Sequence, residues 1–179
     1  MGNQGYAFAE VSGRPDINNN DQNVDLTFII EPGKRTYTRK ILFTGNDITQ
    51  DHVLRREMRQ FEGAWTSDDR IESSRIRLER LGYFKEVAVE TVPVTNTDDL
   101  VDIIYTVEEE STGSIGGQIG YSDFGLQLGF NLSEQNFLGS GNTVAIGINK
   151  NIYSESYNLS YLNPYATIDG ISMGANIYY

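Results

Sequence analysis

Residues 113–177 alternate between apolar and small polar side chains with a period of two. This period is typical of a β-strand, because successive side chains point to opposite faces of a sheet. The polar positions carry Gly, Ser, Asn and Gln and almost no charge, whereas a water-facing sheet usually carries Lys, Glu, Arg and Thr. A membrane-spanning strand has about 9–11 residues, an apolar lipid face and a polar lumen face. The pattern predicts such strands; a soluble β-sandwich with a Gly-rich surface is the alternative.

The alternation recurs in five consecutive runs separated by short connections. The runs are Gly113–Tyr121, Phe124–Ser133, Thr143–Asn149, Ser156–Tyr161 and Ile171–Ile177. Tyr153, Tyr165, Tyr178 and Tyr179 stand near predicted strand ends, where interfacial aromatic residues lie in membrane proteins. Outer-membrane barrels begin at about eight strands, so five strands cannot close one. We therefore expect an incomplete barrel, whose open edges make self-association possible.

Charge is distributed unevenly along the chain, which carries a net charge of -11. Residues 112–179 contain one basic residue, Lys150, and four acidic residues, so a domain boundary is expected near residue 112. The overall acidity argues against nucleic acid as a partner. The chain has no cysteine and a single histidine, His52, which we interpret as a surface residue rather than a metal ligand. No run reaches the roughly 18 apolar residues of a membrane helix, and no signal peptide is evident.

Residues 1–33 contain two strand-like runs around a polar loop. The runs are Phe8–Val11 and Val24–Ile30, and the loop is Pro15–Asn23. Its acidic part, Asn18–Asp21, lacks the spacing of a calcium loop. Two strands cannot bury a core alone, so this segment is expected to be the end of a preceding domain.

Residues 34–111 are expected to form a complete domain with the order β-α-α-β-β. The first helix is predicted from an N-cap at Thr49 through about Gln60, and the second from Thr66 or Ser67 to a C-terminal Gly82. The three predicted strands are Thr36–Phe43, Glu86–Val92 and Val101–Val107. This order makes the domain an α+β fold.

Several motifs in this chain resemble a known family. The segment Val53–Trp65, the sequence Arg80–Phe84 and the strand Val101–Glu109 resemble a POTRA domain. The sequences Gly113–Tyr121, Asn136–Asn142 and Asn163–Tyr165 resemble the opening of the barrel in the BamA-type family of outer-membrane assembly factors. Because the motifs occur in the family's order, the resemblance covers essentially the whole chain.

The resemblance implies an α+β POTRA domain followed by antiparallel transmembrane β-barrel strands. Residues 1–33 would be a remnant of a preceding POTRA domain, 34–111 the last POTRA domain, and 112–179 the first strands of the barrel. The implied function is the folding and insertion of β-barrel proteins into the outer membrane of a Gram-negative bacterium, with the POTRA part in the periplasm. Implied partners are assembly lipoproteins, unfolded client proteins and the lipid bilayer; no catalytic, cofactor or metal site is expected.

Two other classes remain open. A two-partner secretion or autotransporter-assembly relative would also join POTRA domains to a barrel. A soluble surface-antigen module would only bind, and its residues 112–179 would stay in solution without detergent. An outer-membrane enzyme would need clustered acid, base or nucleophilic residues, which the barrel part lacks.

Three groups of residues are candidates for function through the resemblance. Arg55 and Glu62 match lipoprotein contacts and, seven residues apart, could share a helix face; two solvated charges are the alternative. A client strand could pair with an edge strand formed by Glu86, Val87, Ala88, Val89, Glu90, Thr91 and Val92; an ordinary strand blunted by Pro93 is the alternative. The weak lateral seam would be Gly113, Ser114, Ile115, Gly116, Gly117, Gln118, Ile119, Gly120 and Tyr121, unless its glycines merely relieve crowding.

Overall fold

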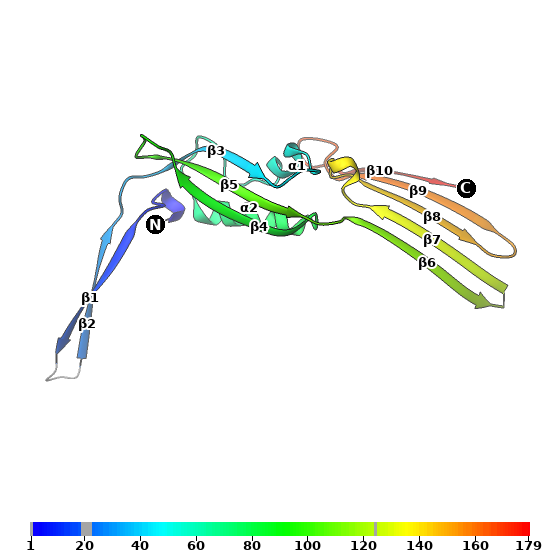
Figure 1. Ribbon diagram of the computed structural model, residues 1–179, viewed down its shortest axis with the longest axis horizontal. Helices are drawn as coiled ribbons and strands as arrows, with labels where there is room; N and C mark the ends of the chain where they lie inside the picture. The colour runs from blue at the N-terminus through cyan, green and yellow to red at the C-terminus, as the bar shows by residue number, and fades with distance from the viewer. Residues whose placement is uncertain (1, 19–22, 124) are drawn as a thin grey trace. The chain divides into compact units, whose positions relative to one another are not determined.

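The computed structural model describes residues 2–18, 23–123 and 125–179 (Figure 1). The predicted loop positions 19–22, and with them most of the Asn18–Asp21 sequence, lie outside the described residues, as does Phe124. The chain divides into two compact units. The first holds residues 1–44, 57–77 and 87–106, and the second holds residues 45–56, 78–86 and 107–179.

The N-terminal part of the first unit is an antiparallel hairpin. A short 3-10 helix, η1 (Gly2–Gln4), precedes β1 (Glu10–Asn18) and β2 (Asn23–Glu31), which pair with Gly13 opposite Phe28. The prediction that a loop begins at Pro15 was wrong, because β1 continues to Asn18. Since β1 has β2 as its single neighbour, the missing N–H of a proline can face away from the ladder.

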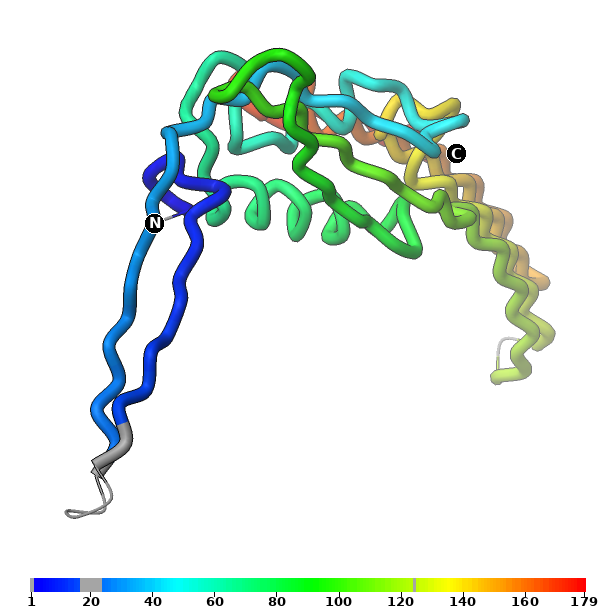
Figure 2. Tube along the Cα trace, turned by 60° about the vertical axis from the view of Figure 1, so that its left-hand side comes forward, coloured from blue at the N-terminus to red at the C-terminus, as the bar shows by residue number. Residues whose placement is uncertain are grey.

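The segment 36–110 has the predicted order β-α-α-β-β. Its elements are β3 (Tyr37–Thr44), α1 (Asp51–Arg55), α2 (Asp68–Arg80), β4 (Phe84–Pro93) and β5 (Leu100–Glu109). The sheet order is β3-β5-β4, with β3 parallel to β5 and a register shift between Thr38 and Lys40. Helix α2 runs along one face of this sheet (Figure 2), where Tyr105 on β5 donates its hydroxyl to the Ile71 carbonyl at 3.2 Å.

The core of the first unit lies between α2 and the sheet. Its buried apolar side chains are Ile41, Met58, Ile71, Val87, Val101, Ile103 and Tyr105. Each such side chain stabilises the fold by about 1.5–3 kcal/mol relative to an exposed position. Burial also raises the pKa of Tyr105 to about 12, so its hydroxyl stays a hydrogen-bond donor.

The first helix is shorter than predicted and begins differently. Helix α1 ends at Arg55, its N-cap is Gln50 rather than Thr49, and the Gln50 side chain makes no cap bond. The chain beyond it is organised by Gln60, which is completely buried. The Gln60 amide donates to Thr38 Oγ1 and to the Trp65 carbonyl, both at 3.0 Å. These bonds hold an irregular segment where the periodicity predicted helix.

The second helix agrees with the prediction. Helix α2 begins directly after Ser67, and Gly82 follows its end with a φ of 70°. That left-handed conformation suits glycine at a helix C-terminus. An unforeseen contact lies at the other end, where Asn3 Oδ1 accepts a hydrogen bond from the Asp69 N–H at 2.9 Å. Residues of the N-terminal segment therefore help to cap α2.

The second unit contains a five-stranded antiparallel sheet, as predicted. Its strands are β6 (Gly113–Ser122), β7 (Gly125–Glu134), β8 (Thr143–Lys150), β9 (Glu155–Asn163) and β10 (Met173–Tyr178). They lie in the order β10-β9-β8-β7-β6, and the sheet is not closed. A 3-10 turn, η2 (Phe137–Gly139), connects β7 to β8.

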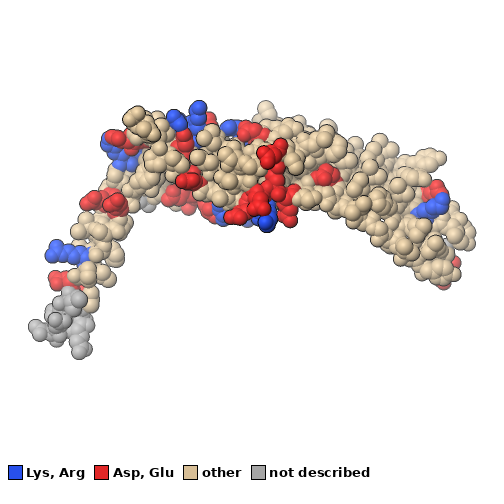
Figure 3. Space-filling model, in the orientation of Figure 1, with Lys and Arg blue, Asp and Glu red and all other residues tan. Residues whose placement is uncertain are grey.

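The register of the sheet separates the two predicted faces. One row across all five strands is apolar: Ile115, Leu132, Ile146, Leu159 and Ile177. The adjacent row on the opposite face is small or polar: Ser114, Ser133, Ala145, Ser160 and Asn176. Charged residues are few on the visible face of this sheet and frequent on that of the POTRA-like segment (Figure 3).

In the part of the chain that the structure describes, no helix is both long and apolar enough to cross a bilayer.

Candidate functional site

The candidate edge for strand addition lies on β4. Residues 86–92 fall inside this strand, and β4 is an outer strand of the order β3-β5-β4. Val87 is buried in the core, while Glu86, Ala88 and Glu90 are exposed. Pro93 closes the strand, so an added strand would have main-chain groups to pair with up to that residue. The geometry therefore provides an available edge.

The candidate seam lies on β6, at the end of the sheet order. All nine predicted seam residues, from Gly113 to Tyr121, fall within this strand, and β7 is its neighbour. Ile115 and Ile119 are 74% and 79% exposed, whereas their cross-strand partners Leu132 and Leu128 are 41% and 44% exposed. The edge strand thus presents both unpaired main chain and uncovered apolar side chains.

The glycines of β6 serve two different purposes. A Cβ at Gly116 would come within 2.4 Å of Asn131 Oδ1, and one at Gly113 within 2.9 Å of Glu134 Oε2. These two glycines make room for side chains of β7. A Cβ at Gly117 would meet nothing within 4 Å, and one at Gly120 would touch Gln127 at 4.0 Å. Crowding therefore explains Gly113 and Gly116. It does not explain Gly117 and Gly120, for which a weak seam strand is the remaining interpretation.

Arg55 and Glu62 do not share a helix face, so that part of the prediction was wrong. Arg55 is the last residue of α1 and forms an ion pair with Asp51 at 2.6 Å. Glu62 lies beyond the helix, and its Oε1 accepts a hydrogen bond from the Ile41 N–H at 2.9 Å. The two residues belong to different compact units. Any partner would have to contact them as separate positions.

The β7–β8 connection is fastened to the segment before α1. Asn136 is buried, donates from Nδ2 to Thr49 Oγ1 at 2.8 Å and accepts at Oδ1 from the Gly141 N–H at 2.8 Å. The Gln50 N–H donates to the Gly139 carbonyl at 2.9 Å. We call the segments 48–50 and 136–141, with the bonds between them, the clasp. Sequence reasoning singled out Asn136–Asn142 for its resemblance and missed this contact.

A close backbone approach makes glycine necessary in the clasp. Gly139 has a φ of 71°, and a Cβ there would lie 1.9 Å from the Ile48 carbonyl oxygen. The preceding Leu138 also has a positive φ, 53°, an uncommon conformation for a residue with a side chain. The clasp therefore stores some backbone strain, which its hydrogen bonds offset.

The carboxylate of Glu109, at the end of β5, supports the clasp. It accepts hydrogen bonds from the backbone N–H groups of Ile48 at 2.9 Å and Thr49 at 2.6 Å. Burial opposes ionisation, but these bonds and one from the Thr49 hydroxyl outweigh it and hold the pKa of Glu109 below its ordinary value. The charged carboxylate therefore stabilises the turn before α1.

We expect Glu109→Gln to weaken the clasp by about 1 kcal/mol at pH 7, because a neutral amide is a poorer acceptor than a half-exposed carboxylate. A depressed pKa in the folded state means that the carboxylate stabilises above the unfolded pKa, about 4.3, and loses its effect as the pH falls through the folded value. The difference between wild type and variant should therefore vanish in acid. Amide exchange of Ile48 and Thr49 from pH 7 to pH 3 measures it.

The exposed Glu90→Gln is the control for this pH series, because it removes a carboxylate from β4 without touching the clasp. If Ile48 and Thr49 exchanged their amide protons at the wild-type rate in Glu109→Gln at pH 7, the hydrogen bonds from these two N–H groups to Glu109 would contribute nothing to the clasp.

A second contact joins Arg56, the C-cap of α1, to the β9–β10 connection. The Arg56 guanidinium lies 4.2 Å from the centre of the Tyr165 ring. The guanidinium is also close to Gly141, where a Cβ would lie 2.5 Å from Nη2. A cation over an aromatic face contributes about 0.5–2 kcal/mol, depending on solvent exposure. Arg56 thus contacts both connections at this end of the sheet.

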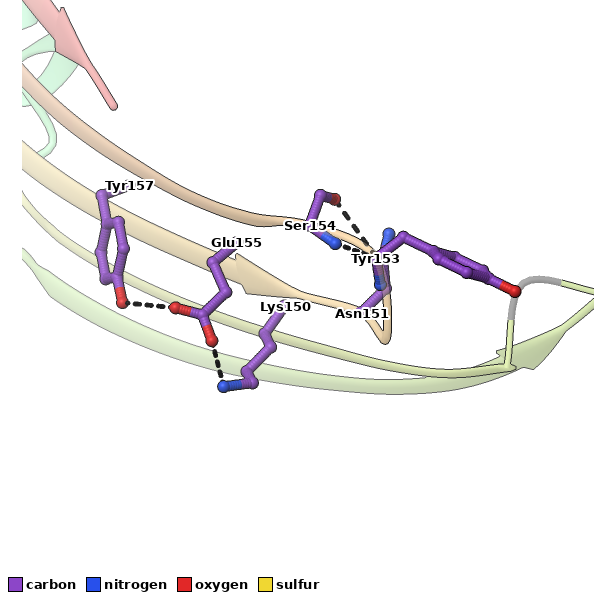
Figure 4. A network of polar contacts seen from close by, with 6 residues as sticks. All are labelled: Lys150, Asn151, Tyr153, Ser154, Glu155 and Tyr157. Atoms are coloured by element: carbon purple, nitrogen blue, oxygen red, sulfur yellow. Dashed lines mark hydrogen bonds and ion pairs between the residues drawn. The ribbon is translucent and has the colours of Figure 1, made fainter.

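The opposite end of the sheet carries a polar hairpin (Figure 4). Asn151 Oδ1 accepts from the N–H groups of Tyr153 at 2.8 Å and Ser154 at 2.7 Å, which closes the β8–β9 turn. Lys150 and Glu155 form an ion pair, and the Tyr157 hydroxyl donates to Glu155 at 3.3 Å. Lys150 and Glu155 occupy the apolar face and end its uncharged stretch.

Among residues 2–18, 23–123 and 125–179, no group of three or more His, Asp or Glu side chains could hold a metal ion. The arrangement instead offers outer strands in two sheets, an apolar face and the clasp.

Comparison with known proteins identifies both parts of the chain. The POTRA model, described as a surface antigen variable number repeat, matches residues 36–110. The Omp85 superfamily domain matches residues 136–179. These two matches place the POTRA segment and the start of the Omp85 barrel in the order that the sequence predicted.

Relatives match along the whole chain. The outer membrane protein assembly factor BamA of Neisseria meningitidis is 38% identical over 99% of this chain and 22% of its own length. That of Buchnera aphidicola is 34% identical over 98% of this chain and 28% of its own length. The chain thus spans about a quarter of these relatives.

A solved structure of a relative has a fold similar to that of this chain. The crystal structure of BamA from Haemophilus ducreyi lacking POTRA domains 1–3 superimposes with a TM-score of 0.87 and 46% identity. The match covers 99% of this chain and 34% of that one. The chain therefore belongs to the BamA-type family of outer-membrane assembly factors, and it carries a POTRA domain followed by the start of an Omp85 barrel.

Proposed function

We propose that this chain is part of a machine that folds and inserts β-barrel proteins into the outer membrane of a Gram-negative bacterium. The observation that carries the proposal is the open sheet edge at β6, in a chain that matches BamA proteins over its whole length. Residues 34–111 would be the last POTRA domain, in the periplasm, and residues 112–179 the first strands of the barrel. Residues 1–33 would end a preceding POTRA domain, which the match to a structure lacking domains 1–3 supports.

The mechanism needs no bond to be made or broken. An incoming client strand gains main-chain hydrogen bonds by pairing with an exposed edge, first at β4 and then at β6. Gly117 and Gly120 weaken β6 because they add backbone entropy and no packing, so its pairing with a closing strand is easily exchanged. The apolar face meanwhile contacts lipid. The same open edges allow a second copy of the chain to pair.

Assembly lipoproteins are proposed to contact Arg55 and Glu62 as two separate positions. Both residues are exposed, and each is a charged group able to form a charge-assisted hydrogen bond across an interface. Glu62→Lys and Arg55→Glu should each reduce capture of the lipoproteins from cell membranes, measured by quantitative pull-down. The exposed Glu90→Lys is the control. If both variants captured as much lipoprotein as wild type, neither Arg55 nor Glu62 would contribute to the lipoprotein interface.

Disulfide trapping in the full-length protein tests the client mechanism. The chain has no cysteine, so each introduced thiol in it is unique. Ser114→Cys and Gln118→Cys on β6 should cross-link to single cysteines in the terminal strand of a stalled client. The client positions that cross-link should recur at every second residue. Ala145→Cys lies on β8, which is paired on both sides, and should not cross-link. Equal trapping at all three positions would contradict a lateral client site at β6.

Membrane contact of the apolar face is tested by a pair of adjacent substitutions. Leu159 belongs to the apolar row and Ser160 to the polar row of β9. We expect Leu159→Arg to reduce stability in liposomes by about 3 kcal/mol and Ser160→Arg to change it little, because a cation is costly on a lipid face. Urea unfolding of the liposome-inserted chain measures both. Equal effects would indicate that the two faces meet the same solvent, as in a soluble sandwich.

A further inference from the structure

An open cavity of about 520 Å³ lies beside the Arg56–Tyr165 contact. Its lining includes His52 and Arg56 from the α1 region, Asn163 at the end of β9, and Asn142, Thr167 and Ile168 from the two connections of the sheet. All of these residues belong to the second compact unit, so the cavity lies within one body.

The lining has an unusual charge for this chain. The chain carries a net charge of -11, yet the residues around the cavity include an arginine and a histidine and no Asp or Glu. The Tyr165 ring orients the Arg56 guanidinium at the wall. The Nε and Nη2 atoms of Arg56 are buried, so Arg56 acts on the cavity through its positive charge rather than through its whole fork of donors. The amides and the hydroxyl of the lining add neutral donors. An anion with several oxygens is the ligand that this chemistry favours.

The cavity lies at the end of the sheet where β6 begins. The register places Gly113 opposite Glu134, Glu134 opposite Val144, and Thr143 opposite Leu162, so the start of β8 and the end of β9 share this end. Ile168 is fully exposed beside the cavity, and Ile171 is 62% exposed. If the sheet spans the membrane as proposed above, this end meets the headgroups of the periplasmic leaflet.

We propose that the cavity binds the phosphodiester headgroup of an anionic phospholipid of the periplasmic leaflet. Arg56 and His52 contact the phosphate, Asn142 and Asn163 bond the polar headgroup, and Ile168 lies along the start of an acyl chain. The proposal rests on the membrane position given by the proposed function. Free phosphate shares the same chemistry, so the experiment must separate the two sources.

The test measures lipid selectivity with the full chain reconstituted in phosphatidylcholine vesicles. Spin-labelled phosphatidylglycerol and phosphatidylcholine are compared by electron spin resonance, which resolves lipids held at the protein. We expect wild type to prefer phosphatidylglycerol roughly tenfold, as one charge-assisted contact would give, and His52→Gln and Arg56→Gln to lower that preference at least threefold. Lys150→Gln, which removes a cation at the other end of the sheet, should keep it.

Each outcome decides the proposal. His52 is exposed, so its variant should keep the fold, which circular dichroism checks even if Arg56→Gln is destabilised. A preference that survives both substitutions, or that is absent from wild type, overturns the headgroup site. Loss of the preference on adding millimolar inorganic phosphate, but not an equal ionic strength of chloride, assigns the cavity to free phosphate and also overturns it. If neither labelled lipid is held at all, the proposed function fails instead.

Discussion

Gly139→Ala is expected to open the clasp, raising amide exchange of Gln50 and Gly141 roughly a thousandfold, which corresponds to about 4 kcal/mol. A methyl group at this position would lie 1.9 Å from the Ile48 carbonyl oxygen, so one of the two backbones must move. The left-handed φ of 71° adds about 1–2 kcal/mol for any residue with a Cβ. Movement would also break the bond from Gln50 N–H to the Gly139 carbonyl, at 2.9 Å, and strain those of Asn136.

Gly63→Ala separates steric clash from backbone strain. Gly63 has a φ of 79°, but a Cβ there would meet nothing within 4 Å. This variant should lose about 1–2 kcal/mol from the left-handed conformation alone, and its clasp amides should exchange at the wild-type rate. Comparable exchange in both variants would mean that the segments 48–50 and 136–141 are not held together as described. The clasp would then be too weak to fix the β7–β8 connection to the turn before α1.

The period-two alternation predicted the five-stranded sheet well, because each face of a strand meets a single environment. The strands begin and end within a few residues of the predicted runs, and the apolar row from Ile115 to Ile177 follows the predicted face. Alternation carries no information on strand order at the edges, however. The position of β6 at an open edge follows only from the order of the strands in the sheet.

The prediction that the first helix extends to Gln60 was wrong because helical spacing is a local signal, whereas the hydrogen-bond partners of Gln60 include a residue that is distant in the sequence. Val53, Leu54 and Met58 are all buried, as an amphipathic helix requires, yet the helix ends at Arg55. Gln60 bonds to Thr38, 22 residues earlier, and so draws the chain out of helical geometry. The shared face expected for Arg55 and Glu62 was lost for the same reason.

The clasp could not be predicted from spacing at all. Asn136 and Thr49 are 87 residues apart, and the local pattern indicated only a helix cap at Thr49. The first of the two glycines in the sequence Asn136–Asn142 was the available signal, since a glycine that follows apolar residues in a turn indicates either a positive φ or a close approach. Gly139 has both. The partner of that close approach, Ile48, is visible only in three dimensions.

Gln60→Glu should destabilise the POTRA segment by about 4 kcal/mol at pH 7, because it places an uncompensated charge in the core. The amide nitrogen of Gln60 donates to Thr38 Oγ1 and to the carbonyls of Phe61 and Trp65. A carboxylate cannot donate to the two carbonyls and would repel them at the same positions. Trp65 is the single tryptophan of the chain, so its fluorescence during urea unfolding reports directly on this site.

The pH dependence distinguishes a buried charge from a lost hydrogen bond. Burial raises the pKa of a carboxyl group, so the new Glu would be neutral in acid and the destabilisation should shrink as the pH falls from 7 to 4. Gln60→Leu loses the same bonds without a charge, which should cost about 2–3 kcal/mol with little change over this range. The exposed Gln4→Glu makes the same substitution in the same unit and should be neutral. If Gln60→Glu were equally tolerated, Gln60 would not be holding the irregular segment between α1 and α2, and the early end of α1 would need another cause.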